Sequence, residues 1–225
     1  MISVILPTYN EARNIGPVLS AVADIFRDRA IDGEIIVVDD DSPDGTAGLA
    51  LERARSCPVR VRVRKGVRGL SGAVIEGFRM ARGEICVVMD ADLSHPVEKI
   101  PALVRPILEG RCDLAVGSRY LPGGGTGDWP LSRRIISRGA GLLARGLTPL
   151  SDPTSGFMAL RKSILRGVEL DPLGWKIVLE VVVKTRPRIL EVPIVFRERR
   201  EGKSKLGFRA QLDYLRHLAR LYTRR

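Results

Sequence analysis

Two carboxylates separated by one residue form the sharpest chemical feature of the sequence. Asp90 and Asp92 follow residues 84–89, an apolar run with the length and composition of a buried strand. Residues i and i+2 of an extended chain face the same way, and open α/β sheets bind ligands at the carboxyl ends of their strands. Two such carboxylates form a hard oxygen site for Mg²⁺ or Mn²⁺, whose coordination is completed by phosphate and water. The alternative is an aspartate pair that only caps the strand or the following helix.

A second acidic cluster follows an earlier apolar run, residues 34–38. Asp39 is the nearest to the strand end, and we expect it to bind a base or ribose, as carboxylates do in dinucleotide-binding folds. For Asp41 and Asp44 we favour turn and cap chemistry, because Asp41 precedes the Ser-Pro-Asp-Gly turn of residues 42–45 and Asp44 lies within it. No G-x-G-x-x-G opens the first helix, which argues against an ordinary nicotinamide or flavin domain.

The elements that position these carboxylates alternate along the first half of the chain. Short apolar runs and amphipathic segments follow one another, which is typical of βαβ units around a mostly parallel sheet. We expect strands at residues 2–6, 34–38, 59–63, 84–89 and 112–116. We expect helices at residues 17–26, 46–54, 72–81 and 97–108, with Pro17 near the start of the first. The predicted fold class is therefore α/β.

The second half is less regular. Glycines crowd residues 123–127, so we expect an irregular loop there, a candidate lid or substrate loop. Helices are predicted at 132–147 and 207–222 and a strand at 188–196, while residues 175–184 fit either a helix or a strand. The last helix is expected to place its apolar row on one side: Leu212, Leu215, Leu218 and Tyr222. We divide the chain into a catalytic domain, residues 1–206, and a basic amphipathic C-terminal helix, residues 207–225.

Composition narrows the class of protein. The 225 residues are 44% hydrophobic and 28% charged, as in a folded globular protein, and Lys and Arg outnumber Asp and Glu by 37 to 26. The net charge of +11 suggests nucleic acid or a membrane surface as partner, but only 5% of residues are aromatic, which disfavours stacking on single-stranded bases. Three scattered cysteines predict neither a disulfide framework nor a zinc site, and we expect them to be buried reduced thiols.

Seven short segments occur together in one order and resemble the inverting family 2 glycosyltransferases, which have the GT-A fold. Within that family the resemblance is closest to the dolichol-phosphate and polyprenol-phosphate mannose synthases. The segments are PTYNE (7–11), VDDDSPDGT (38–46), GLSGA (69–73), MDADLSHP (89–96), GSRY (117–120), DPTSGF (152–157) and SKL (204–206). The resemblance covers nearly the whole chain and is far more specific than any one motif.

The resemblance implies a reaction and a set of site residues. The donor would be GDP-mannose, the acceptor a polyprenyl (dolichyl) monophosphate, and the products polyprenyl-phosphate mannose and GDP. Carried over by motif, the residues that bind the nucleotide sugar would be Pro7, Tyr9, Glu11, Asp39, Asp90, Ala91, Asp92, Arg119, Arg199 and Lys205. The metal, Mg²⁺ or Mn²⁺, would be held by Asp90 and Asp92, and by Ser94, which stands where many relatives have Gln.

The acceptor changes what catalysis requires. A lipid monophosphate is already an anion at neutral pH, so no strong general base is needed, and cations must hold it in line with the anomeric carbon. The resembled enzymes keep basic residues at the positions of Arg119 and Arg133. The resemblance therefore implies that Arg119, Arg133 and Ser137 contact the acceptor phosphate and that Asp92, Arg119 and Arg133 are the catalytic residues. The motif SKL follows Lys203, a cation where relatives usually carry an acid.

The acceptor also implies a membrane. No uncharged apolar run approaches the roughly 20 residues that span a bilayer, and the first residues lack the pattern of a signal peptide. We therefore expect a cytoplasmic protein, peripheral on the cytoplasmic face of a membrane and held by its charge and C-terminal helix or by a membrane-anchoring partner subunit. Two alternatives stay open: a transferase of the same family that uses UDP-glucose, and, from charge alone, a nucleic-acid-binding protein. We expect no nucleic-acid partner, because no motif supports one.

Overall fold

A mostly parallel sheet forms the centre of the molecule. The computed structural model describes residues 1–66, 68–174, 176–197 and 208–223. Within them the sheet has seven strands in the order β3-β2-β1-β4-β6-β5-β7. The strands are β1 (Ile2–Thr8), β2 (Gly33–Asp39), β3 (Val59–Val63), β4 (Ile85–Val88), β5 (Leu114–Ser118), β6 (Met158–Arg161) and β7 (Ile189–Pro193). The expected α/β class and mostly parallel sheet are confirmed.

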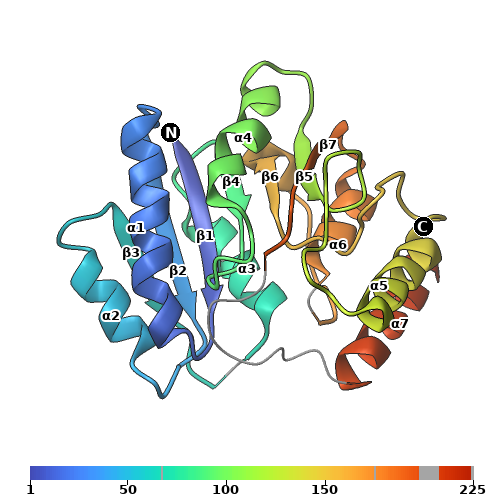
Figure 1. Ribbon diagram of the computed structural model, residues 1–225, viewed down its shortest axis with the longest axis horizontal. Coiled ribbons are helices and arrows are strands. Elements are labelled where there is room, and N and C mark those ends of the chain that lie inside the picture. The colour runs from blue at the N-terminus through green and yellow to red at the C-terminus, as the bar shows by residue number, and fades with distance from the viewer. Residues whose placement is uncertain (67, 175, 198–207, 224–225) are drawn as a thin grey trace.

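Helices cover both faces of this sheet, so the strands β1, β2, β4 and β5 are buried on both sides and are mostly apolar, whereas the edge strands β3 and β7 are largely half-buried. One face carries α1 (Ala12–Asp28), α2 (Thr46–Arg53) and α4 (Ile100–Leu108), the last preceded by the 3₁₀ turn Val97–Lys99. The other carries α3 (Leu70–Met80) and α6 (Ile177–Thr185), and a second 3₁₀ turn, Lys162–Leu165, follows β6. Figure 1 shows the two layers of helices with the sheet between them.

Two further helices, α5 (Leu131–Ala144) and α7 (Phe208–Thr223), lie side by side at one end of the molecule (Figure 1). They share a small apolar cluster with α6, in which Ala144, Leu179 and Leu218 are buried. Tyr214 and Tyr222 of α7 donate hydrogen bonds to the carbonyls of Ala140 and Leu143. These contacts join the two helices into one unit.

The strand β6 runs antiparallel between β4 and β5, and the sequence did not predict it. Met158 at its start pairs with Val88 at the end of β4. The loop before β6, residues 152–157, is thereby brought to the edge of the sheet where β4 ends. At Gly156 an added Cβ would lie 3.3 Å from His95 Cε1 and 3.6 Å from Asp90 Oδ1, so this loop closely approaches the first carboxylate.

Several expectations about elements need correction. The first helix begins at Ala12, so Pro17 lies inside it rather than near its start. The ambiguous segment is the helix α6, whose run of valines is buried on nearly all sides between the sheet and its neighbours. It ends where Arg186 adopts φ 44°, one residue before Pro187, which cannot continue a helix.

The apolar row expected on the last helix is divided. Leu218 is buried, but Leu212, Leu215 and Tyr222 are exposed. The buried side of α7 consists of Tyr214, His217, Leu218 and Leu221, which follow the i, i+3, i+4, i+7 spacing of a packed helical face. The row chosen from sequence lies about a third of a turn away, because Tyr214 and His217 were not counted as buried.

Two further sequence expectations can be compared with the structure. Cys86 and Cys112 are buried and Cys57 is half-buried, and all three are free thiols. Of the helices in the described part of the chain, none has the length and apolarity needed to cross a bilayer.

Candidate active site

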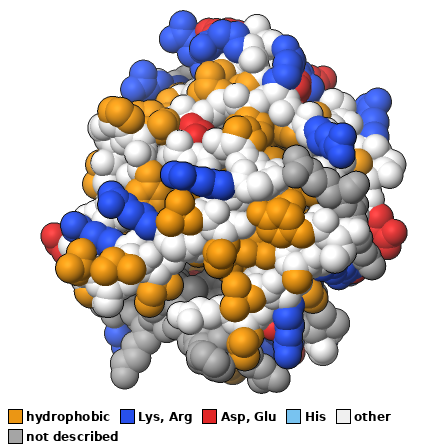
Figure 2. Space-filling model, turned by 90° about the vertical axis from the view of Figure 1, so that its right-hand side faces the viewer, with side chains coloured by type: hydrophobic (Ala, Val, Ile, Leu, Met, Phe, Trp, Pro, Cys, Tyr) orange, Lys and Arg blue, Asp and Glu red, His pale blue; other side chains and the backbone are white. Residues whose placement is uncertain are grey.

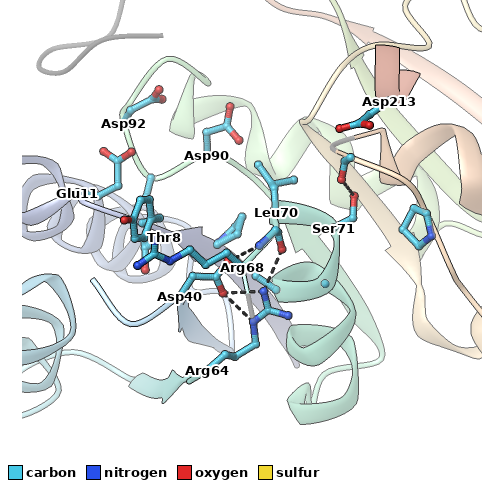
Figure 3. Close-up of a pocket in the computed structure, with 18 residues that line it drawn as sticks. Thr8, Glu11, Asp40, Arg64, Arg68, Leu70, Ser71, Asp90, Asp92 and Asp213 are labelled. Atoms are coloured by element: carbon cyan, nitrogen blue, oxygen red, sulfur yellow. Dashed lines mark hydrogen bonds and ion pairs between the residues drawn. The ribbon is translucent and has the colours of Figure 1, made fainter. Parts of the chain in front are cut away.

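A cavity of about 620 Å³ opens at the carboxyl ends of β1 and β4. Figure 3 shows the carboxylates of Glu11, Asp90 and Asp92 around one side of it, and Asp213 of α7 across from Glu11. The lining residues come from the ends of β1 and β4, from the residues that follow β2 and β3, from the start of α3, and from α7 and the loop before α6. They are Pro7, Thr8, Tyr9, Glu11, Asp40, Arg64, Arg68, Gly69, Leu70, Ser71, Gly72, Ala73, Asp90, Ala91, Asp92, Pro172, Gly174 and Asp213. Of the predicted site residues, this cavity brings together Pro7, Tyr9, Glu11, Asp90, Ala91 and Asp92.

A buried histidine fixes the position of Asp90. The backbone N–H of Asp90 donates to His95 Nδ1 at 3.0 Å, and the imidazole stacks on Phe157 with ring centroids 5.1 Å apart. Burial lowers the pKa of His95, although the carboxylates of Asp90 and Asp92 oppose this shift. The ring is therefore neutral at pH 7, and its Nδ1 can accept the hydrogen bond.

Asp90 and Asp92 differ in exposure. The side chain of Asp90 is 29% exposed, whereas Asp92 is only 2% exposed and accepts the backbone N–H of Ser94 on Oδ1 at 3.0 Å. Ser94 is fully buried, and its Oγ has no hydrogen-bond partner among the described residues. The buried Ser94 hydroxyl without a partner, two residues after Asp92, and the two carboxylates that line the cavity together form a donor set that fits a hard divalent cation.

The protein offers few ligands of its own to such a cation. In the described ranges no group of three or more His, Cys, Asp and Glu side chains converges on one point. Two carboxylates and a hydroxyl suit Mg²⁺ or Mn²⁺, which keep waters and take oxygens from substrate phosphates. This arrangement differs from a closed structural metal site, in which the protein supplies every ligand.

The roles of the aspartates at the end of β2 and in the turn that follows it differ in part from those predicted. Asp39, the predicted ligand, is fully buried and does not line the cavity. Its carboxylate accepts hydrogen bonds from Thr8 Oγ1 at 2.8 Å and from the N–H and Oγ of Ser42 at 2.8 and 2.6 Å. Asp40 lines the cavity instead. Asp44 accepts the backbone N–H groups of Ala12 and Thr46, which is the cap chemistry expected of it.

Two arginines in the cavity wall were missed from sequence. Arg64 forms an ion pair with Asp40 at 2.6 Å, and Asp40 also accepts the backbone N–H of Gly69 at 2.7 Å. Arg68 lies over the ring of Tyr9, with its guanidinium carbon 4.5 Å from the ring centroid. The alternation of Arg and Val from residue 60 to residue 64 was the available signal, because it marks a half-buried strand that ends in a cation.

The predicted acceptor residues lie outside the cavity lining. Arg119 is buried and makes a bidentate ion pair with Asp152, in which both its Nε and its Nη2 lie 2.6 Å from carboxylate oxygens. Burial alone would raise the pKa of Asp152, but the hydrogen bonds and charge of Arg119 outweigh it and hold this pKa below its ordinary value. Much of the charge of Arg119 is therefore balanced within the protein.

Arg133 and Ser137 are the other two predicted acceptor contacts. The guanidinium of Arg133 stacks on Trp129, 3.8 Å from the ring centroid, and the buried Trp129 also faces Arg119 at 5.0 Å. Ser137 Oγ accepts the hydroxyl of Tyr120 at 2.7 Å. Arg199 and Lys205 fall outside the described residues.

Lys176 is a further cation that sequence reasoning did not select. Its Nζ donates to the carbonyl of Thr154 at 3.0 Å. Burial and the nearby charge of Arg119 lower the pKa of Lys176 to about 8. The group is thus only partly protonated slightly above neutral pH.

Comparison with known proteins identifies the family. The family model described as Glycosyl transferase family 2 matches residues 3–168, more than half of the chain. The chain belongs to glycosyl transferase family 2. The resemblance seen in the sequence motifs is thereby confirmed.

This glycosyltransferase has curated relatives along almost all of its length. It is 46% identical to the dolichol-phosphate mannosyltransferase of Pyrococcus furiosus, over 98% of this chain and 63% of the relative. It is 41% identical to the dolichol-phosphate mannosyltransferase of Saccharomyces cerevisiae, over 98% of this chain and 86% of the relative. The chain thus spans less than two thirds of the length of the Pyrococcus protein.

Solved structures show the same fold. The glucosyl-3-phosphoglycerate synthase of Mycobacterium tuberculosis, in complex with Mn²⁺, UDP-glucose and phosphoglyceric acid, superposes with a TM-score of 0.71 at 22% identity, covering 100% of this chain and 79% of that one. At this identity the likeness concerns the fold alone. The GT-A fold expected for this glycosyltransferase is confirmed.

Proposed function

We propose that this chain transfers mannose from GDP-mannose to a polyprenyl (dolichyl) monophosphate with inversion, giving polyprenyl-phosphate mannose and GDP. The observation that carries the proposal is the cavity at the end of β4, where Asp90 and Asp92 meet Tyr9, Glu11 and Arg68. The names of the Pyrococcus and Saccharomyces relatives support the choice of sugar and acceptor. The assignment of guanine as the base of the donor nucleotide rests on the resemblance of the sequence motifs.

The residues of the cavity have distinct tasks in this reaction. Asp90 and Asp92, with Ser94 beside them, would hold a divalent cation, Mg²⁺ or Mn²⁺, which supplies positive charge to the leaving diphosphate. The Mn²⁺ in the glucosyl-3-phosphoglycerate synthase complex supports a metal of this class. Tyr9 and Arg68 form a stacked pair that can hold the nucleotide.

The bond changes need no general base. An oxygen of the acceptor phosphate attacks the anomeric carbon from the side opposite the diphosphate, and the bond between that carbon and the diphosphate oxygen breaks with its electron pair going to GDP. Arg133 and Ser137 would hold the acceptor phosphate in line, and the fixed Arg119 would offset repulsion between the two phosphate groups. Asp152 keeps Arg119 in its buried position.

The experiment is an assay of mannose transfer from labelled GDP-mannose to a polyprenyl phosphate, with Mg²⁺ or Mn²⁺. Asp90→Asn and Asp92→Asn should each lower kcat/KM by about a hundredfold or more, because electrostatic stabilisation of a leaving group contributes about that much. Asp24→Asn, in an ion pair with Arg27 at the surface of α1, is the matched control and should retain wild-type activity. A folded wild-type protein that transfers nothing with either metal would refute the proposal. Transfer from UDP-glucose but not from GDP-mannose would show that UDP-glucose is the donor.

Work at the cytoplasmic face of a membrane is part of the same proposal, because a polyprenyl acceptor resides in a bilayer. An anionic membrane surface fits the net charge of +11. A membrane-anchoring partner subunit stays a prediction.

A further inference from the structure

The helix α5 exposes its apolar side. Leu131, Ile135, Ile136, Leu142 and Leu143 are 71%, 62%, 56%, 56% and 53% exposed, whereas Ala144 is the one residue of α5 that is buried. A surface helix of a soluble domain normally turns its apolar stripe toward the core and its charges toward water. A contiguous exposed apolar stripe of this kind marks an interaction surface.

The opposite side of α5 is directed at the protein. Arg133 stacks on Trp129, Ser137 bonds to Tyr120, and the carbonyl of Ala140 accepts a hydrogen bond from Tyr214. These three residues are spaced by three or four positions, so they share one helical face. Leu131, Ile135 and Leu142 lie on the opposite side of the helix, and Ile136 and Leu143 lie on the flank between the two sides. One helix therefore presents apolar side chains outward and the predicted acceptor-phosphate contacts inward.

The apolar surface continues onto α7. Leu215 and Tyr222 are 48% and 45% exposed, and the hydroxyl of Tyr222 donates to the carbonyl of Leu143 at 2.9 Å. Figure 2 views the end of the molecule that α5 and α7 form, and hydrophobic side chains gather there with Lys and Arg side chains among them. We call the five exposed apolar residues of α5, with Leu215 and Tyr222, the outer face.

Charge decides which partner fits the outer face. Arg134, Arg138 and Arg145 of this segment are exposed, and residues 129–150 contain four arginines and no Asp or Glu. A second copy of the same face would bring like charges together, which is unfavourable at an interface. An anionic lipid surface offers both apolar chains for the leucines and negative headgroups for the arginines.

We propose that the outer face docks on an anionic membrane leaflet, with α5 lying in the plane of the interface. Docking in this orientation places Arg133 and Ser137 just above the headgroups, where the phosphate of a bilayer-resident acceptor lies. The docked orientation would bring the proposed acceptor-binding residues to the membrane surface, where a lipid substrate presents its phosphate. The choice of acceptor rests on the proposed function, but the docking itself does not.

The test measures cosedimentation with phosphatidylcholine vesicles prepared with and without phosphatidylglycerol. Wild type should bind the anionic vesicles, less tightly as salt is raised. The double variant Ile135→Glu/Leu142→Glu should bind at least about tenfold more weakly, because it places carboxylates where apolar chains would enter the interface. The control Leu51→Glu/Leu108→Glu changes residues of α2 and α4 that are 56% and 68% exposed, and it should bind like wild type.

A second pair of measurements isolates charge and oligomer formation. Arg138→Gln/Arg145→Gln should weaken binding to anionic vesicles and leave any binding to neutral ones unchanged. Light scattering without lipid should give a monomer for wild type and for every variant. Wild type that stays in the supernatant at every salt concentration, outer-face variants that bind like wild type, or a lipid-free dimer that Ile135→Glu/Leu142→Glu dissociates would each overturn the proposal.

Mannose transfer separates this inference from the proposed function. With a short-chain polyprenyl phosphate dissolved in water, Ile135→Glu/Leu142→Glu should transfer at the wild-type rate, whereas with a long-chain acceptor in anionic vesicles it should lose at least about tenfold. Equal activity of variant and wild type on the vesicle-borne acceptor would overturn docking while leaving the reaction intact. Absence of transfer to either acceptor would refute the reaction, and the vesicle measurements would still decide docking.

Discussion

The buried pair of Arg119 and Asp152 makes the sharpest prediction about stability. The two side chains are 7% and 0% exposed, and two short hydrogen bonds join them. Asp152→Asn keeps the size and shape of the side chain but removes its charge, so the guanidinium of Arg119 stays buried without a counter-ion. Removal of one partner from a buried ion pair costs about 3–5 kcal/mol.

The expected loss can be measured by urea unfolding. Since the free energy of unfolding falls by about 1–3 kcal/mol per molar urea, a loss of about 3–5 kcal/mol should lower the midpoint by about 1–5 M. The matched control is Asp113→Asn, because Asp113 and Arg188 have the same bidentate geometry at 2.9 Å but the arginine is 62% exposed. Solvent screens that pair, so its midpoint should barely move.

A second variant tests whether the uncompensated charge of Arg119 causes the loss of stability. If the buried charge is responsible, Arg119→Met/Asp152→Asn should recover much of the stability lost in Asp152→Asn, because it removes the stranded cation. A midpoint for Asp152→Asn within about 0.5 M of wild type, or a double variant less stable than the single one, would refute the reasoning.

The same pair predicts a dependence on pH. Because the folded-state pKa of Asp152 is lowered, its stabilising contribution is complete above the unfolded pKa of about 3.9 and is lost as pH falls from there toward the folded value. The difference in stability between wild type and Asp152→Asn should therefore shrink below about pH 4. A difference that stays constant on acidification would contradict this assignment.

Three further predictions concern packing, the cavity and a shifted lysine. Gly77→Ala should cost about 1–3 kcal/mol in thermal unfolding, because its Cβ would clash with Cγ2 of Ile5. Gly139→Ala, with open space around it in α5, should stabilise by about 0.5–1 kcal/mol. Arg68→Ala should weaken GDP binding about two- to fivefold in calorimetry, because its stacking on Tyr9 is lost. The control Arg79→Ala, on the exposed side of α3, should leave GDP binding unchanged. An equal loss of GDP affinity in both variants would show that the net positive charge, and not the stacking, is responsible. The pKa of Lys176 is lowered to about 8 in the folded protein, whereas the unfolded lysine keeps its proton to about pH 10.4. The stability of wild type relative to Lys176→Met should therefore rise between pH 8 and about pH 10. A stability difference in urea unfolding that is the same at these two pH values would reject the shift.

The sequence predicted most of the sheet because local patterns encode it. Strands β1, β2, β4 and β5 are apolar runs, and β3 alternates Val with Arg. The predicted bounds of all five strands lie within two residues of the observed ones at both ends. The strand β6 was missed because Met158–Arg161 is short and ends in a charge, and its place is fixed by pairing with two strands far away in the sequence. The packed side of α7 was misassigned for a similar reason, since the α5 carbonyl that accepts from Tyr214 is invisible in the α7 sequence.

The site was predictable where motifs follow strands and less so elsewhere. Asp90 and Asp92 were selected because ligands bind at the carboxyl ends of strands in open α/β sheets, and both line the cavity, whereas their role as metal ligands stays a prediction. Asp39 was chosen over Asp40 by its distance from the strand end, but successive residues face opposite ways, and the structure directs Asp40 to the cavity. Pro172, Gly174 and Asp213 could not be found at all, because they reach the cavity only through tertiary packing.

The position of β6 also governs the order in which the fold can assemble. β4 and β5 leave the ribosome early, but each is paired on one side with a strand formed by residues 158–161. A nascent chain that ends before Met158 can pair β1, β2, β3 and β4, and it leaves one edge of β4 open and β5 without a neighbour. Open edges of this kind pair readily with other chains. Four residues in the second half of the sequence therefore join β4 to β5, and until they are synthesised both strands present open edges.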